Sequence, residues 1–179
     1  YVLSVLRREI SVKSIRLMCI VALLLVALPR TVAAQGPDGV SMLVVVPQYY
    51  GANLYLNIDN YEAFGWDITL AGMSENVEPC PIFASPNGCP QLAVDLLLTE
   101  VEDVTAYDVV ALMPVQSQRS LDPYRDVMDN PAMLDMIREA VDAGVIVFAP
   151  CAAVRVLAAA GVIDGVEVTG HTNYFYEYV

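Results

Sequence analysis

The stretch Val145-Ile-Val-Phe-Ala-Pro-Cys151-Ala-Ala-Val-Arg-Val-Leu-Ala-Ala-Ala-Gly161 decides the fold. Its first part is a short β-branched and apolar run, which predicts a buried strand without a polar face. From Ala152 to Ala160 the residues are mostly strong helix formers, and Gly161 stands where a helix commonly ends on glycine. The sequence therefore predicts a strand that turns directly into a helix at Cys151.

A cysteine at such a turn has two interpretations. In a nucleophile elbow, the sharp turn lifts the side chain above the sheet and the next helix aims its N–H groups at the sulfur, which favours a reactive thiolate. In the alternative, Cys151 is a small buried hydrophobic residue. His171, the only histidine of the chain, follows ten residues after Gly161. It is either an acid/base partner of the thiol or a structural, hydrogen-bonded histidine.

The segment Val145–His171 resembles the nucleophile segment of the ThiJ/PfpI superfamily, which belongs to the class I glutamine-amidotransferase-like fold. The matching motifs are Cys-Ala-Ala, Leu-Ala-Ala-Ala-Gly-Val-Ile-Asp-Gly and Val-Thr-Gly-His. The resemblance extends back through Tyr107-Asp108-Val-Val-Ala-Leu, Leu43-Val-Val-Val and Gly65-Trp-Asp-Ile-Thr-Leu-Ala-Gly72, so it covers nearly all of the chain after residue 40. It implies an α/β fold: a doubly wound parallel sheet with helices on both faces, a flavodoxin-like sandwich.

The periodicity of the other segments agrees with this fold. Apolar runs predict strands at 41–46, 66–71, 94–98, 108–113 and 166–169, and helical patterns span 53–64 and 131–143. Alternating strands and helices predict a parallel sheet, whose ligands bind at the carboxyl ends of its strands. Cys151 falls at such an end. In the helix that follows, helical spacing predicts that Val154, Leu157 and Ala158 face the sheet.

The resemblance also implies a site, and the chain matches it in part. The family pattern has a cysteine and a nearby histidine, which Cys151 and His171 match, and a carboxylate after the first strand. That position, counted back from Gly65, holds Asn53. An amide can hydrogen-bond to a thiol but cannot share a titrating proton with it. Tyr49 and Tyr50 follow the first strand and either line the pocket or cap the sheet.

A second departure concerns the glycine pair that the family has after the third strand. Met113-Pro114-Val115 stands in its place. Pro114 has no N–H, so the Val115 N–H is the remaining candidate oxyanion donor. Ala152 is a further candidate oxyanion or pocket residue; the protease-like branch has histidine at that position, so a peptidase is disfavoured. A glutamine amidotransferase is disfavoured too, because its His-x-Glu is missing from the chain.

The first 34 residues form a predicted secretory signal peptide. Basic residues precede an apolar run from Leu17 to Leu28, and Val32-Ala33-Ala34 offers a cleavage site before Gln35. We therefore expect a secreted or periplasmic protein, with a retained membrane anchor as the alternative. Residues 35–179 are expected to form one domain. Family members continue beyond the position that matches Val179, so the resemblance also implies an incomplete C-terminus.

Charge and cysteine content narrow the partners. The whole chain has a net charge of −12, and removal of the signal segment leaves 4 basic and 20 acidic residues, a net charge of −16. Such a polyanion is not expected to bind nucleic acid. Cys80 and Cys89 lie in a proline-rich loop of an exported protein, which predicts a local disulfide; a metal site is the weaker alternative, because no histidine accompanies them.

Two functions remain open at this stage. The first is a cysteine-dependent small-molecule hydrolase, hydratase or aldehyde-detoxifying enzyme with Cys151 as nucleophile. The second is a non-catalytic ligand-binding or stress-related member with a degenerate site. Both predict a small-molecule ligand or substrate, with a homodimer as an open alternative for the assembly, and we expect neither a cofactor nor a metal. The membrane is expected to be involved only through an uncleaved signal segment.

Overall fold

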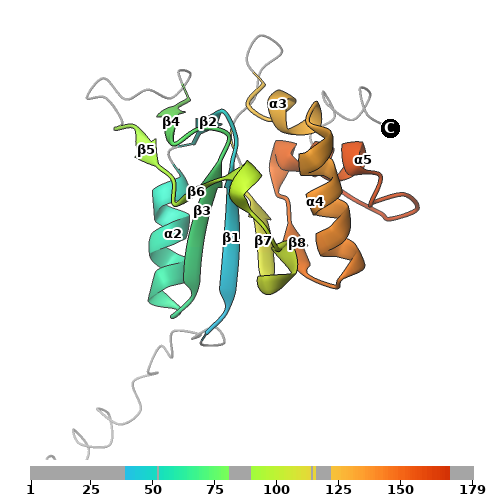
Figure 1. Cartoon of the computed structure of the whole chain (residues 1–179), viewed down its shortest axis with the longest axis horizontal. Coiled ribbons are helices and arrows are strands. Elements are labelled where there is room, and N and C mark those ends of the chain that lie inside the picture. The colour runs from blue at the N-terminus through green and yellow to red at the C-terminus, as the bar shows by residue number, and fades with distance from the viewer. Residues whose placement is uncertain (1–38, 52, 81–89, 114, 116–121, 170–179) are drawn as a thin grey trace, which may run out of the picture. The chain divides into compact units, whose positions relative to one another are not determined.

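The structure is a computed structural model, and it describes residues 39–51, 53–80, 90–113, 115 and 122–169. Five strands form the main sheet: β1 (Ser41–Val46), β3 (Asp67–Gly72), β6 (Leu96–Leu97), β7 (Val109–Leu112) and β8 (Ile146–Phe148). Their order is β6-β3-β1-β7-β8, and every neighbouring pair is parallel. The predicted α/β fold with a parallel sheet is confirmed, with β1 at its centre (Figure 1).

The strands of the centre are apolar on both sides because both faces of the sheet are covered. Met42, Val44 and Val46 of β1 belong to a buried cluster that includes Leu54 of α2 (Asn53–Ala63). Leu43 and Val45 belong to the opposite cluster. Helices α3 (Arg125–Met128), α4 (Pro131–Asp142) and α5 (Val154–Ala160) contribute to that second cluster. Two layers of helix on one sheet therefore produce the two cores.

Helix α4 begins and ends where its sequence predicts. Asn130 caps it by accepting a hydrogen bond from the Ala132 N–H at 3.1 Å, and Pro131 is its first residue. Met133 and Ile137 are buried and Leu134 packs against the core, whereas Val141 is exposed. Val141 lies in the last turn of the helix, close to its end at Asp142.

A smaller sheet sits beside the main one and takes up the segment after β1. It has the order β2-β4-β5, where β2 is Tyr49–Tyr50, β4 is Asn76–Pro79 and β5 is Leu92–Ala93. The strand predicted at 94–98 is present only as β6, at Leu96–Leu97, and β5 lies just before it in the smaller sheet. Short 3-10 turns at Leu98–Glu100 and Val104–Ala106 then lead into β7.

Two strand predictions near the elbow are wrong in part. β8 does form, but Ile146 is 65% exposed and Phe148 is 44% exposed, so it is not a buried strand. β8 is the last strand in the order, and these two residues pair with Val109 and Ala111 on the face that α2 covers farther along the sheet. The strand predicted at 166–169 is absent, and these residues are irregular. An alternating apolar pattern forms a stable strand only where a neighbouring strand pairs with it. Among the described residues, no helix combines the length and hydropathy that a membrane span requires.

Candidate active site at the Cys151 elbow

Cys151 stands on a strained turn between β8 and the next helix. Its φ is +57°, and it is the one non-glycine residue with a positive φ in the described part of the chain. Residues other than glycine rarely adopt this left-handed backbone conformation, which costs them about 1–2 kcal/mol. Cys151 is also exposed. Of the two interpretations of its sequence, the structure therefore has the features of the elbow and not those of a buried hydrophobic residue.

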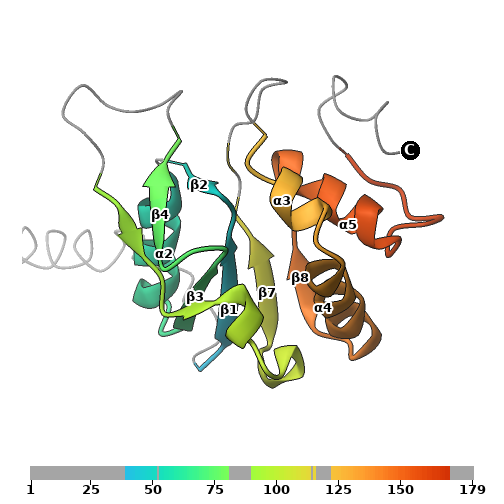
Figure 2. The same ribbon diagram turned by 45° about the horizontal axis from the view of Figure 1, so that its top comes forward.

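The chain after Cys151 continues the turn without a break. Residues Cys151–Ala153 form a 3-10 turn and α5 follows at once, as Figure 2 shows at the end of β8. Gly161 ends the helix with φ of +71°, and its N–H donates to the carbonyls of Leu157 and Ala158. The predicted strand, turn, helix and terminal glycine are all present in this order.

The face that α5 buries differs from the predicted one. The residues that it buries are Arg155, Val156 and Ala160, whereas Val154, Leu157 and Ala158 are only half-buried. The 3-10 turn at Cys151–Ala153 has about three residues per turn instead of 3.6, which sets the starting angle of the helix. Periodicity counted along the sequence does not include that change of phase.

A buried ion pair, which no motif of the sequence predicts, lies directly behind the elbow. Arg155 is 4% exposed, and its guanidinium binds Asp122 through two contacts of 2.7 Å each. Its Nε also donates to the Ala152 carbonyl at 3.1 Å. Arg155 therefore joins the elbow turn to the segment before α3. Its one signal in the sequence is a charge inside an otherwise apolar helix.

Tyr124 extends this cluster toward the end of β7. It is fully buried, its N–H donates to the Asp122 carboxylate at 3.2 Å, and its hydroxyl donates to the Met113 carbonyl. Burial raises the pKa of the Tyr124 phenol far above its ordinary value, and the negative charge of a Cys151 thiolate adds to that increase. Tyr124 is thus a neutral hydrogen-bond donor to the Met113 carbonyl.

The predicted oxyanion and pocket residues are distributed as follows. Ala152 is buried beside Cys151, and the Val115 side chain is buried two residues after Met113, whose carbonyl Tyr124 holds. Asn53 is exposed at the first position of α2. Ala152 is therefore the next residue after the thiol. The hydrogen bonds of Tyr124 to Asp122 and to the Met113 carbonyl connect the Arg155–Asp122 pair to the end of β7. Pro114 and His171 lie outside the described residues.

The tyrosine pair forms β2 of the small sheet, and its role as a pocket lining stays a prediction. Tyr50 is buried, its hydroxyl donates to the Pro90 carbonyl at 2.5 Å, and its ring meets that of Tyr55 edge-on. Tyr49 is half-buried and pairs with Glu78 in β2. Cys80 is buried, with its N–H bonded to the Tyr50 carbonyl at 2.9 Å. Cys89 lies outside the described residues, so the Cys80–Cys89 disulfide stays a prediction.

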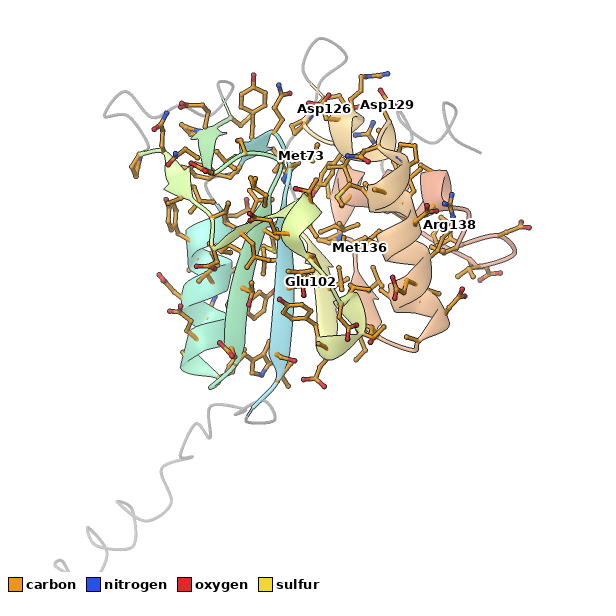
Figure 3. The ribbon with its side chains drawn as sticks, in the orientation of Figure 1. Met73, Glu102, Asp126, Asp129, Met136 and Arg138 are labelled. Atoms are coloured by element: carbon orange, nitrogen blue, oxygen red, sulfur yellow. The ribbon has the colours of Figure 1, made fainter. Side chains whose placement is uncertain are left out.

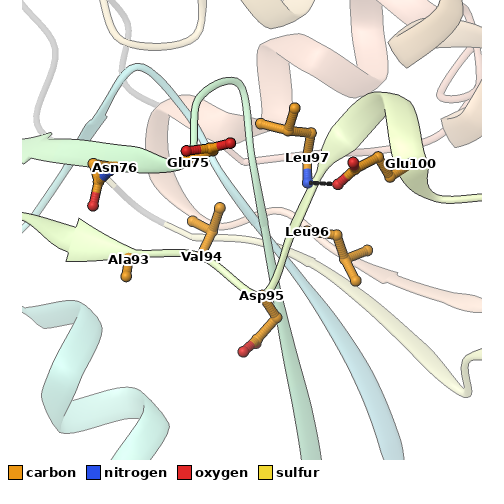
Figure 4. Close-up of a pocket in the computed structure, with 8 residues that line it drawn as sticks. All are labelled: Glu75, Asn76, Ala93, Val94, Asp95, Leu96, Leu97 and Glu100. Carbon is orange, nitrogen blue, oxygen red and sulfur yellow. Dashed lines mark hydrogen bonds between the residues drawn. The ribbon is translucent and has the colours of Figure 1, made fainter.

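A hollow lies at the opposite edge of the main sheet from the elbow, beside β6. It has a volume of about 370 Å³ (Figure 4), and its wall includes the carboxylates of Glu75, Asp95 and Glu100. Two of these already accept backbone hydrogen bonds, Asp95 from Leu70 and Glu100 from Leu97, each at 2.7 Å. In the described part of the chain, no set of three cysteine, histidine or carboxylate side chains could hold a metal ion. This hollow is separate from the elbow, because β3, β1 and β7 lie between β6 and β8.

Comparison with known proteins places the chain in a family. The profile of the DJ-1/PfpI family matches residues 42–179, which is most of the chain and includes the elbow. The chain belongs to the DJ-1/PfpI family. This confirms the resemblance seen in the sequence. No curated protein matches the chain closely enough to add to it.

Solved structures of DJ-1/PfpI proteins share the fold at low identity. A two-domain protein of Anabaena variabilis, with DJ-1/ThiJ/PfpI-like and ferritin-like domains, is 17% identical at a TM-score of 0.63; the match covers 78% of this chain and 37% of that one. Oxidized DJ-1 of Toxoplasma gondii is 20% identical at a TM-score of 0.60, covering 78% and 71%. DJ-1beta of Drosophila melanogaster is 24% identical at 0.51, covering 69% and 61%. These identities establish the fold alone.

Proposed function

We propose that this DJ-1/PfpI-family chain is an exported, cysteine-dependent enzyme that acts on a small electrophile, as a hydrolase, hydratase or aldehyde-detoxifying enzyme. One observation carries the proposal: Cys151 is exposed on a left-handed turn, with φ of +57°, at the carboxyl end of a parallel strand. Strain of this kind persists where the surrounding structure fixes it, and it concentrates at functional sites. The carboxyl ends of parallel strands are where such sheets bind their ligands.

The proposed first step is addition of the Cys151 sulfur to the substrate. For an aldehyde, a carbon–sulfur bond forms, the carbonyl π bond opens, and the oxygen takes a proton to become a hemithioacetal hydroxyl. The backbone N–H groups of Ala152 and Val115 are the proposed donors to the developing oxyanion. His171 is the proposed proton carrier, and Asn53 the proposed hydrogen-bond partner of the thiol. Water then displaces the sulfur: a carbon–oxygen bond forms at the same carbon, the carbon–sulfur bond breaks, and one proton of the water returns to the Cys151 sulfur. The aldehyde leaves as its hydrate.

A second candidate function has its own support. The position of the family carboxylate holds Asn53, and Pro114 removes one N–H from the segment where the family has two glycines. Both changes weaken proton transfer and oxyanion binding. They favour a non-catalytic member that has kept the elbow and binds a small ligand there.

The remaining parts of the proposal concern the compartment and the assembly. Export rests on the basic residues, apolar run and Val32-Ala33-Ala34 of the first 34 residues. The Cys80–Cys89 disulfide rests on their spacing and on the oxidising compartment that export implies. A homodimer is proposed as the assembly. N-terminal sequencing of the exported protein, peptide mapping without reductant and light scattering test these three parts one by one.

Turnover of small aldehydes by four proteins separates the two functions: the wild type, Cys151→Ser, His171→Ala and Asn53→Glu. An enzyme should lose consumption of the aldehyde in Cys151→Ser and lose about 100-fold in His171→Ala, because general acid–base catalysis commonly contributes that much. A wild type that turns nothing over, but gains activity in Asn53→Glu, is a family enzyme that has lost its acid. Full activity in Cys151→Ser would refute the proposal.

A further inference from the structure

A continuous series of buried polar contacts connects the elbow to the end of β7. The Arg155 guanidinium binds the Asp122 carboxylate, that carboxylate accepts from the Tyr124 N–H, and the Tyr124 hydroxyl donates to the Met113 carbonyl. Arg155 also donates to the Ala152 carbonyl, within the elbow turn itself. Each group in the series has little or no contact with water, since the side chains of Arg155 and Asp122 are 4% and 7% exposed.

The buried Arg155–Asp122 ion pair is not explained by stability alone. Removing two charges from water costs about as much as their attraction returns, so a well-packed apolar pair often serves as well. The pair does have good geometry, with two parallel contacts and a third to the backbone. Its rigid fork fixes orientation, which an apolar contact does not. A role in placing neighbouring atoms therefore accounts for its position behind Cys151.

We propose that Arg155 and Asp122 are positioning residues for Cys151, which hold the elbow against the end of β7 and keep the net charge behind the sulfur at zero. This inference rests on the proposed role of Cys151 as the reacting group. Tyr124 links the two segments, because its N–H binds Asp122 and its hydroxyl binds the Met113 carbonyl. Met113 lies two residues before the candidate donor Val115. Neither Arg155 nor Asp122 needs to touch the substrate in this role.

The charged groups around the elbow define what the pair can do. Arg155 donates to the carbonyl of Ala152, the residue after Cys151, and Asp122 binds both Arg155 and the Tyr124 N–H, so the pair lies directly behind the elbow turn. On α3, which packs beside α5 (Figure 2), Arg125 and Asp126 are exposed and screened by solvent. Figure 3 labels Arg138 on α4. Its guanidinium binds Asp135 and the Ala160 carbonyl at the far end of α5. Arg155 and Asp122 are therefore the buried charges of opposite sign at the thiol.

The test is the pH dependence of Cys151 alkylation by iodoacetamide in folded protein. Tryptic cleavage after Arg138, or after Arg125 in a variant that lacks Arg138, yields a peptide that contains no cysteine but Cys151, so its labelling is read by mass. Asp122→Asn leaves a buried cation, which stabilises the thiolate, and Arg155→Met leaves a buried anion, which destabilises it. The midpoint pH should fall in the first variant and rise in the second, each by about one unit. The double variant should return close to the wild type.

Matched controls use the other ion pair. Asp135→Asn and Arg138→Met make the same changes in the pair of α4 that binds the far end of α5, and they should leave the midpoint unchanged. Should a single variant fail to fold, Arg155→Lys keeps the charge without the fork, so its midpoint should shift less than that of Arg155→Met. A shift in the same direction for Asp122→Asn and Arg155→Met, or a shift in Arg155→Lys as large as that in Arg155→Met, would overturn the inference.

Alkylation needs no turnover, so this test is independent of the proposed enzyme activity. A wild type without aldehyde consumption refutes the activity and leaves the opposite shifts to be measured. Opposite shifts together with turnover support both proposals. Turnover without opposite shifts retains the activity and removes the positioning role of the pair.

Discussion

At the scale of single residues, the backbone of Cys151 is the most informative feature of the chain. A φ of +57° is normal for glycine, which lacks a Cβ, and costs other residues about 1–2 kcal/mol. At most positions, a protein with glycine is less stable than one with alanine, because glycine gives the unfolded chain more conformational freedom. The elbow conformation should therefore reverse the usual order of stability between glycine and alanine.

This reversal is measurable. We expect Cys151→Gly to be more stable than Cys151→Ala by about 1 kcal/mol in urea denaturation, because only alanine retains the left-handed strain. Both variants remove the thiol, so each is the other's control. If Cys151→Gly were the less stable of the two by a similar amount, Cys151 would not occupy a left-handed turn.

Asp108 is a second residue whose chemistry can be tested, at the other end of the sheet. Its carboxylate accepts from the Ser41 N–H and the Ser41 hydroxyl, each at 2.8 Å, and these bonds join the starts of β1 and β7. They lower the pKa of Asp108 below its ordinary value. A group whose pKa is depressed by folding stabilises the fold above its unfolded pKa, about 3.9, and that contribution is lost as the pH falls through the folded value.

The wild type should therefore lose more stability than Asp108→Asn when the pH is lowered from 5 to about 2.5. Asp108 is exposed to solvent, so the difference is expected to be small and to shrink in high salt. Urea midpoints at both pH values give the comparison, with Asp126→Asn as an exposed control on α3. Equal losses of stability at low pH in the wild type and Asp108→Asn would contradict this role for the carboxylate.

At the scale of elements, α5 carries the packing that supports the elbow. Val156 is fully buried, whereas Val154, two residues earlier in the same helix, is half-buried. Truncating Val156 removes two buried methyl groups and leaves a cavity, which should cost about 2 kcal/mol or more. Val154→Ala is the matched control and should cost clearly less. Equal losses in chemical denaturation would mean that α5 is not oriented as described.

These elements also show how far the sequence predicts the fold. Apolar runs predict β1, β3 and β7, and helical spacing with the Asn130-Pro131 start predicts α4, because these features are local. The buried face of α5 depends on the 3-10 turn before it, and the exposure of β8 depends on which neighbours cover it. The Arg155–Asp122 pair joins residues 33 apart in the sequence. No local pattern reports such a contact.

At the scale of the whole domain, the order of the strands separates the Cys151 elbow from the acidic hollow. The elbow follows β8 at one edge of the sheet, and the acidic hollow lies beside β6 at the other. Cys151 is predictable as a candidate from sequence because strand, cysteine and helix adjoin in the chain. Its surroundings are not, since Asp122, Tyr124 and Met113 come from segments before α3 and at the end of β7.

The central claim is that the chain acts through Cys151, and stoichiometric labelling tests it most directly. Iodoacetamide is added to the folded wild type in steps up to one equivalent, and aldehyde consumption is measured beside tryptic mapping of the peptide Glu139–Arg155. Exposure of Cys151 and burial of Cys80 predict that the label enters this peptide first. Consumption should fall in proportion and vanish at one label per chain. The claim would be contradicted if the protein still consumed aldehyde once its Cys151 was fully labelled. It would also be contradicted if the unlabelled protein consumed none.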